Sequence, residues 1–129
     1  MTIQLNDWKV KDLTFTLIEN SSREENGFTL ETANIFFDNN KDEFAVIIKV
    51  NISDVLFDLK IESFFTFKLD EEITEDFKLS DFPKINAPAI AFPYLRAYIS
   101  NLTLQSGVEP VILPSINFVK LAERKKKDE

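Results

Sequence analysis

The stretch FDLKIESFFTFKL, residues Phe57–Leu69, decides the fold that this sequence predicts. Apolar and polar side chains alternate along most of it with a period of two, which is the period of a β-strand and not of a helix. The apolar positions predict one face toward a core: Phe57, Leu59, Ile61, Phe65, Phe67 and Leu69. One apolar and one polar face are typical of a strand in an antiparallel sheet with one side buried.

Three other segments of the N-terminal half carry the same signal. In residues 43–55 every second residue from Phe44 to Ile52 is apolar, and residues 11–19 alternate in the same way. A weaker candidate runs from about Phe28 to Phe37. Turn-forming residues separate these segments, so the sequence predicts a four-stranded antiparallel β-meander. In a meander each strand pairs with the next strand along the chain.

The pattern changes after residue 70. Pro83 and Pro88 interrupt residues 71–92, which we therefore expect to be an irregular connector. Pro93 suits the first turn of a helix, and we predict a helix from about Pro93 to Gln105 that ends at Gly107.

A second helix is predicted from Asn117, whose side chain can cap it, to about Lys126. The sequence thus predicts an α+β fold with an antiparallel sheet followed by two helices. We expect residues 1–129 to form one domain, with the sheet in residues 1–70, the connector in 71–92 and the helical part in 93–129.

The first predicted helix has more apolar surface than one contact requires. Leu95, Ile99 and Leu102 form one stripe, which is enough to dock a helix on a sheet. Tyr94 and Tyr98 add a second, mixed line. The wider surface indicates a second contact, such as a partner subunit, but deep burial in a monomer explains it equally well.

Composition excludes several classes of function. The chain has 129 residues and no histidine or cysteine, its net charge is −7, and its two glycines are too few for a phosphate-binding loop. We therefore predict no enzyme, no catalytic residues, no cofactor and no nucleic-acid partner. The acidic clusters Asp42–Glu43 and Asp70–Glu72 are explained as solvated turns, so no metal site is predicted. Without a basic leader or a long apolar run, we expect a soluble cytoplasmic protein that does not insert into membranes.

Apolar side chains remain that one sheet face and one helix stripe do not easily cover. Phe36 and Phe37 are adjacent and so point to opposite faces of a strand, and Phe64 lies on a polar face. The segment Val108–Leu113 adds four more apolar side chains. Exposed apolar patches usually mark interaction sites. The alternative, that these residues complete the core or a dimer contact, stays open.

Two motifs carry a resemblance to a known family. APAIAFPYLRAYISNLTLQSG, residues 87–107, and LPSINFVKL, residues 113–121, resemble the C-terminal half of the SecB export chaperones. The matching residues are Phe92, Pro93, Tyr94 and Arg96, then Asn117, Phe118 and Leu121. KDLTF, residues 11–15, also looks like the first strand of that family.

The resemblance implies ATP-independent binding of unfolded polypeptides or preproteins for Sec-dependent export. It implies a homotetramer, a dimer of dimers, whose central interface includes Tyr94, Tyr98 and Leu102. Bound polypeptides would lie in long hydrophobic grooves lined by the second strand, the loop before the last helix, and the last helix. At those positions we predict the peptide-binding residues: Phe28, Leu30, Val108, Val111, Leu113 and Leu121.

The family also docks the motor ATPase SecA through acidic residues on the outer sheet face. Asp12 matches the first of these acids, but Thr16 and Lys60 stand at the next two positions. Two alternatives therefore stay open. One is a SecB-like chaperone dedicated to a specific partner such as an antitoxin, and the other is a structural protein-interaction domain.

Overall fold

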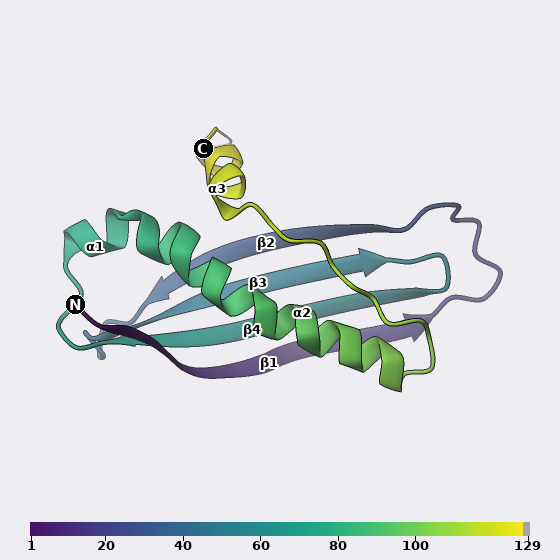
Figure 1. The fold of residues 1–129 in the computed structure, drawn as a ribbon, viewed down its shortest axis with the longest axis horizontal. Coiled ribbons are helices and arrows are strands. Elements are labelled where there is room, and N and C mark those ends of the chain that lie inside the picture. The colour runs from purple at the N-terminus through teal and green to yellow at the C-terminus, as the bar shows by residue number, and fades with distance from the viewer. Residues whose placement is uncertain (128–129) are drawn as a thin grey trace. The chain divides into compact units, whose positions relative to one another are not determined.

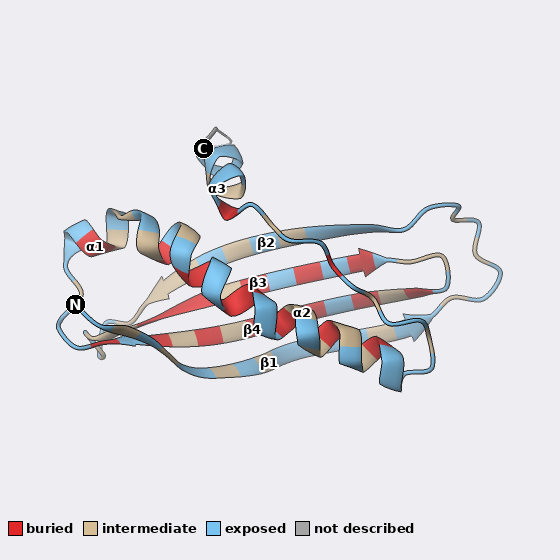
Figure 2. Cartoon of the chain, in the orientation of Figure 1, coloured by how far each residue is buried: buried red, intermediate tan, exposed pale blue. Residues whose placement is uncertain are grey.

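The two central strands of the sheet, β3 (Glu43–Ser53) and β4 (Phe57–Leu69), have the buried face that their alternation predicts. A computed structural model describes residues 1–127 of the chain and the side chains of residues 1–126. Every second residue from Phe44 to Ile52, and from Phe57 to Leu69, is buried (Figure 2). The one polar member of this set, Ser63, donates its hydroxyl proton to the carbonyl of Ile48 at 3.0 Å.

The sheet is antiparallel, with β1 (Ile3–Leu17) and β2 (Gly27–Phe36) at its two edges (Figure 1). The strand order is β1-β4-β3-β2, so the predicted meander is correct for β2, β3 and β4 but wrong for β1. The first strand pairs with β4 because residues 18–26 form a long connection instead of a tight hairpin. This connection crosses three strand spacings of about 4.8 Å each, and the result is a Greek-key order.

Strand β1 begins earlier than the alternation of residues 11–19 predicts. Its pairing with β4 shifts between Leu5 and Asp7 and again between Val10 and Asp12, and these irregularities break the period of two in the sequence. The predicted common face of its C-terminal half is confirmed by the residues opposite on β4: Leu13 with Ile61, Phe15 with Leu59, and Leu17 with Phe57. Leu17 is nevertheless 61% exposed, because β1 is an edge strand.

The chain divides into two compact units, Met1–Ile73 and the residues from Thr74 onward. The second unit contains α1 (Glu75–Leu79), a π-helical turn η1 (Phe82–Asn86), α2 (Ala87–Gln105) and α3 (Phe118–Lys127). Two predicted helices are therefore present, together with two short elements that the sequence did not indicate as helices. In the described part of the chain, no helix combines the length and the apolar character that crossing a bilayer requires.

The predicted irregular connector, residues 71–92, is wrong over most of its length, since it contains α1, η1 and the beginning of α2 from Ala87 onward. Pro83 and Pro88 lie in the first turns of η1 and α2, where a missing N–H costs little. Pro93 lies inside α2, so the carbonyl of Ala89 has no donor four residues on. Ala89 is exposed, and water can hydrogen-bond to that carbonyl instead.

The predicted C-terminal end of α2 and the predicted N-cap of α3 agree with the structure. Helix α2 ends at Gln105, and Gly107 follows with a φ of 89°, a left-handed conformation that glycine adopts without strain. The Asn117 side chain accepts a hydrogen bond from the Lys120 amide at 3.1 Å, which confirms the predicted cap of α3. The last two residues of the predicted helical part, Asp128 and Glu129, lie outside the described residues.

Candidate functional site

The first candidate surface lies on β2, at one edge of the sheet. Phe28 and Leu30 stand opposite the buried residues Ile52 and Val50 of β3, so they share the core face. Because β2 is an edge strand of the sheet in the described residues, this face reaches solvent here. Phe28 is 38% exposed and Leu30 is half-buried. Two of the six predicted peptide-binding residues therefore form an apolar edge that is continuous with the core.

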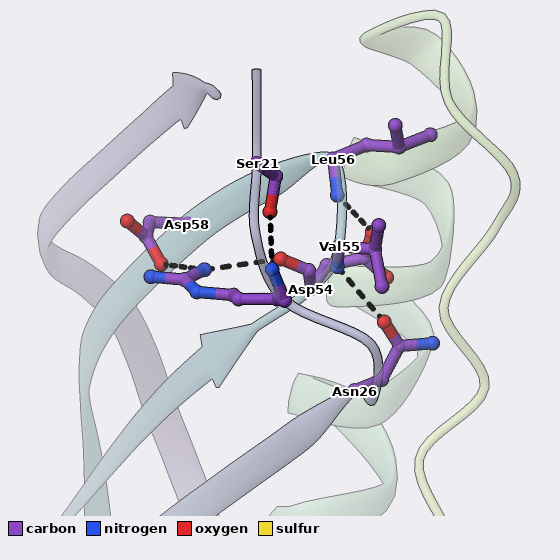
Figure 3. A network of polar contacts seen from close by, with 7 residues as sticks. Ser21, Asn26, Asp54, Val55, Leu56 and Asp58 are labelled. Atoms are coloured by element: carbon purple, nitrogen blue, oxygen red, sulfur yellow. Dashed lines mark hydrogen bonds and ion pairs between the residues drawn. The ribbon is translucent and has the colours of Figure 1, made fainter. Parts of the chain in front are cut away.

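The start of β2 is fixed by polar contacts between residues 18–26 and the β3–β4 turn (Figure 3). We call this group, formed by Arg23, Asn26, Asp54 and Asp58, the Arg23 clasp. The Arg23 Nη1 atom donates to Asp58 Oδ1 at 2.7 Å and to the Asp54 carbonyl at 3.0 Å. The Val55 amide donates to Asn26 Oδ1 at 2.9 Å. Since β2 begins directly after Asn26, the clasp sets where the apolar edge starts.

The clasp also changes the titration of its charged groups. The hydrogen bond from Arg23 lowers the pKa of Asp58 below its ordinary value, and the attraction between the two charges acts in the same direction. The same hydrogen bond raises the pKa of Arg23. Both side chains are more than one-third exposed, so water screens the pair and its contribution to stability is small.

The second candidate surface lies in the segment after α2. Val108 and Val111 are half-buried there, as is suitable for residues that contact a ligand. Leu113 is only 4% exposed, so it has little surface to offer, although the sequence predicts it as a contact. Ile112, which was not among the predicted residues, is 81% exposed. Alternation with a period of two along this segment is the signal that would have predicted opposite burial for Ile112 and Leu113.

The predicted contact on α3 lies one turn after the start of that helix. Leu121 is half-buried, and its amide donates to the carbonyl of Asn117 at 3.1 Å. Phe118, the first residue of α3, is buried with its ring edge against Phe92 of α2, at 5.8 Å between ring centroids. The cap and this aromatic pair fix the start of α3, and with it the position of Leu121 within the second unit.

The residues predicted at an oligomer interface lie on α2, away from its buried side. Tyr94 is 51% exposed, whereas Tyr98 and Leu102 are half-buried at the boundary of the buried side. Tyr94 belongs to an exposed row with spacings of four and three residues, which is the spacing of a coiled-coil seam. We call this row the α2 stripe: Ile90, Tyr94, Ala97, Asn101 and Leu104. Ile90 lies before the predicted start of this helix at Pro93 and was therefore not predicted as an interface residue.

The predicted SecA contact, Asp12, lies on the outer face of the sheet, opposite Glu62 of β4. Glu62 is held between two lysines, with Lys11 Nζ at 3.6 Å and Lys49 Nζ at 3.4 Å. The residue opposite Thr16 is Asp58, which forms an ion pair with Arg23. The carboxylates opposite Asp12 and Thr16, Glu62 and Asp58, are therefore paired with cations.

Comparison with protein families gives a match over nearly the whole chain. The model of the SecB family, described as preprotein translocase subunit SecB, matches residues 2–129. An uncharacterized protein of Methanocaldococcus jannaschii is 31% identical in an alignment that covers 89% of this chain and 79% of that protein. The match to the family model includes the sheet and the helices.

Bacterial proteins named protein-export protein SecB match over a shorter range. The protein of Anaplasma phagocytophilum is 28% identical over 63% of this chain and 55% of its own length. The protein of Dinoroseobacter shibae is 31% identical over 61% of this chain and 49% of its own length. The aligned part thus spans about half the length of these relatives.

Two solved structures share the fold. A SecB-like chaperone of Mycobacterium tuberculosis, in complex with a ChAD peptide from the HigA1 antitoxin, has a TM-score of 0.69 at 18% identity, and the match covers 88% of this chain and 87% of that one. A protein of unknown function from Streptococcus agalactiae has a TM-score of 0.54 at 11% identity, covering 88% and 98%. Both confirm the four-stranded antiparallel sheet followed by helices.

Proposed function

The chain belongs to the SecB family, and on this basis we propose that it is a cytoplasmic, ATP-independent holdase, a chaperone that binds unfolded polypeptides or preproteins without folding them. The observation that carries the proposal is the accessibility of apolar side chains where the family resemblance assigns polypeptide contacts. These are Phe28 and Leu30 on β2, Val108 and Val111 after α2, and Leu121 on α3.

The energetics of such surfaces suit transient binding. A polypeptide that buries about 600 Å² of apolar surface gains roughly 15 kcal/mol before costs, at ~25 cal/mol per Å². Ordering a flexible chain consumes much of this gain. The net affinity is then modest and depends little on the sequence of the bound polypeptide. A modest affinity allows the polypeptide to be released to the next factor. Sec-dependent export is the route that the family description favours for the bound polypeptides.

The assembly in this proposal is a homotetramer, a dimer of dimers, with the α2 stripe in an interface. Support comes from exposed apolar side chains such as Ile90 and Leu104 on α2, and Leu17 on β1. An exposed row with coiled-coil spacing is self-complementary when two copies meet around a two-fold axis.

The proposal is tested by light scattering from a chemically unfolded protein that aggregates on dilution. The chain, without any nucleotide, should suppress aggregation when present in molar excess, and the unfolded protein should remain able to refold after release. Aggregation that proceeds at the same rate with and without the chain would contradict holdase activity.

A second candidate function is that of a chaperone dedicated to one partner, such as an antitoxin. Two observations favour it: the paired carboxylates around Asp12 weaken the case for SecA, and the M. tuberculosis neighbour was solved with an antitoxin peptide. Affinity capture from a lysate separates the two candidates. A general holdase retains many unfolded proteins, whereas a dedicated chaperone, or a structural interaction domain, retains one stoichiometric partner.

A further inference from the structure

The buried hydroxyl of Thr103 has a function that α2 alone does not explain. Thr103 lies near the C-terminal end of α2 and is fully buried. Its hydroxyl donates to the carbonyl of Ile99 at 2.8 Å, and the carbonyl of Ser100 lies 3.0 Å away as a second acceptor. Such a local bond adds little to a helix, and a valine of the same shape would fill the site without a polar atom.

The same hydroxyl has a second partner outside the helix. The Val111 amide donates to Thr103 Oγ1 at 2.9 Å, and the Val108 amide donates to the Thr103 carbonyl at 3.3 Å. Among the hydrogen bonds described for residues 108–116, these two are the ones that reach α2, and both end on Thr103. One residue, Thr103, therefore accepts both of these hydrogen bonds from the segment.

Two prolines flank the attached segment and restrict its backbone, which affects the direction in which its side chains point. Pro110 and Pro114 bracket Val111–Leu113, and the residues directly before them, Glu109 and Leu113, are restricted to extended backbone. Successive side chains of an extended segment point in opposite directions. Leu113 is accordingly buried and Ile112 is the most exposed large apolar side chain of the described residues. Holding the Val111 amide therefore decides the direction in which Ile112 points.

We propose that Thr103 is a positioning residue that holds the segment Val111–Leu113 so that Ile112 contacts an apolar side chain of the bound polypeptide. This inference rests on the proposed holdase function and deepens it. It adds one contact residue, Ile112, and one residue that acts through the segment without touching the ligand. Thr103 itself is fully buried and has no surface for a direct contact.

The positioning step is tested on the unliganded protein by hydrogen exchange at the Val111 amide. Thr103→Val keeps the shape but removes the acceptor, so the Val111 amide should exchange at least about tenfold faster. Thr103→Ser keeps the hydroxyl and should restore slow exchange. Amides of β3 should be unaffected in both variants. Equal exchange at Val111 in Thr103→Val and wild type would overturn the positioning role.

The binding step is tested by calorimetric titration with reduced, carboxymethylated α-lactalbumin, which is permanently unfolded. Thr103→Val and Ile112→Ser should each raise Kd by about tenfold, while Thr103→Ser binds as wild type. Leu79→Ser is the matched control, because Leu79 of α1 is 74% exposed and lies outside the candidate surfaces. Wild-type affinity in Ile112→Ser would overturn its contact role, and this comparison decides even if Thr103→Val does not fold.

Two further outcomes separate the inference from the function on which it rests. If Thr103→Val accelerates exchange at Val111 but binds the probe as wild type does, the segment is positioned for a reason other than binding, and the inference is wrong. If the wild-type protein does not bind the probe, the holdase proposal fails together with the contact role of Ile112. The exchange data would then still report whether Thr103 holds the segment.

Discussion

The central strands and the segment Val111–Leu113 are built from the same kinds of side chain but differ in their surroundings. Val46, Ile48 and Val50 of β3 are fully buried between two paired strands, whereas Ile112 is almost fully exposed. Strand β3 is hydrogen-bonded along both edges, while the segment is bracketed by prolines and attached through one residue. Apolar composition alone therefore does not distinguish a buried side chain from an exposed one.

The difference has a physical consequence for function. Burial of side chains in the sheet stabilises the fold at all times, because their neighbours come from the same chain. The apolar surface of the segment gains its free energy only when another polypeptide covers it. Mutations in the two regions should thus change different quantities, unfolding in one region and binding in the other.

The largest expected effect is on the free energy of unfolding, and it is tested by comparing two adjacent phenylalanines of β4. Phe65 is fully buried and stacks on Trp8 at 5.2 Å between ring centroids, whereas Phe64 is half-buried on the outer face. Phe65→Ala should lower the free energy of unfolding by about 3–5 kcal/mol, as truncation of a core aromatic does. Phe64→Ala, the matched control, should cost less than half as much. Urea unfolding measures both, and equal losses would mean that the two faces of β4 are not distinct.

The second effect concerns binding and should leave folding nearly intact. Changing both Leu30 and Val111 to serine removes apolar surface from each candidate region. We expect the Kd for an unfolded protein to rise by about a hundredfold, near 2.7 kcal/mol. Unfolding should remain cooperative, because both residues are only half-buried. Unchanged binding by the double variant would show that these two positions do not belong to the binding surface.

A third effect tests the α2 stripe. Leu104→Asp places a charge on this exposed row and should weaken self-association by about tenfold or more, because an unpaired charge in an apolar contact is costly to desolvate. Sedimentation velocity should give a tetramer for the wild type and smaller species for the variant. Leu79→Asp changes a similarly exposed leucine on α1 and should leave the tetramer intact. A wild-type monomer at micromolar concentration would remove the basis for the predicted interface.

The smallest effect concerns the Arg23 clasp, which fixes the start of β2. Because the hydrogen bond from Arg23 lowers the pKa of Asp58 in the folded state, its stabilisation is fully present above the unfolded-state pKa. The stabilisation is lost as pH falls through the lower, folded-state value. Thermal unfolding should therefore show Asp58→Asn below wild type at pH 7, with the gap closing at a pH below about 4.

Asp38→Asn, which changes an exposed carboxyl outside the clasp, is the control for this measurement. A gap between Asp58→Asn and wild type that stays constant down to acidic pH would mean that the charge of Asp58 does not stabilise the clasp.

The central strands were predictable because they follow one simple physical rule. The alternation in residues 57–69 gave the bounds of β4 and its buried face, since a strand buried on one side must alternate. The first half of β1 was missed because two irregularities in pairing break that alternation. The position of β1 beside β4 depends on a long connection, and local patterns do not determine where such a connection ends.

In the helical unit, the predicted helix bounds were wrong for a different reason. Prolines that suggested an irregular connector occupy first turns, where the missing N–H does no harm, and Pro93 is tolerated inside α2. The helix was therefore predicted to start at Pro93 instead of Ala87, and Ile90 was not predicted to lie on it. The hydrogen bond between residues eight positions apart, Thr103 and Val111, is a contact that no periodic pattern reveals.

Calorimetric titration without nucleotide tests the central claim most directly. A slow-folding protein is presented once in its chemically unfolded form and once in its folded form. We expect binding to the unfolded form with a Kd in the micromolar range or below, and no heat of binding with the folded form. Absence of binding to both forms, or equal binding to both, would contradict the claim that this chain recognises unfolded polypeptides.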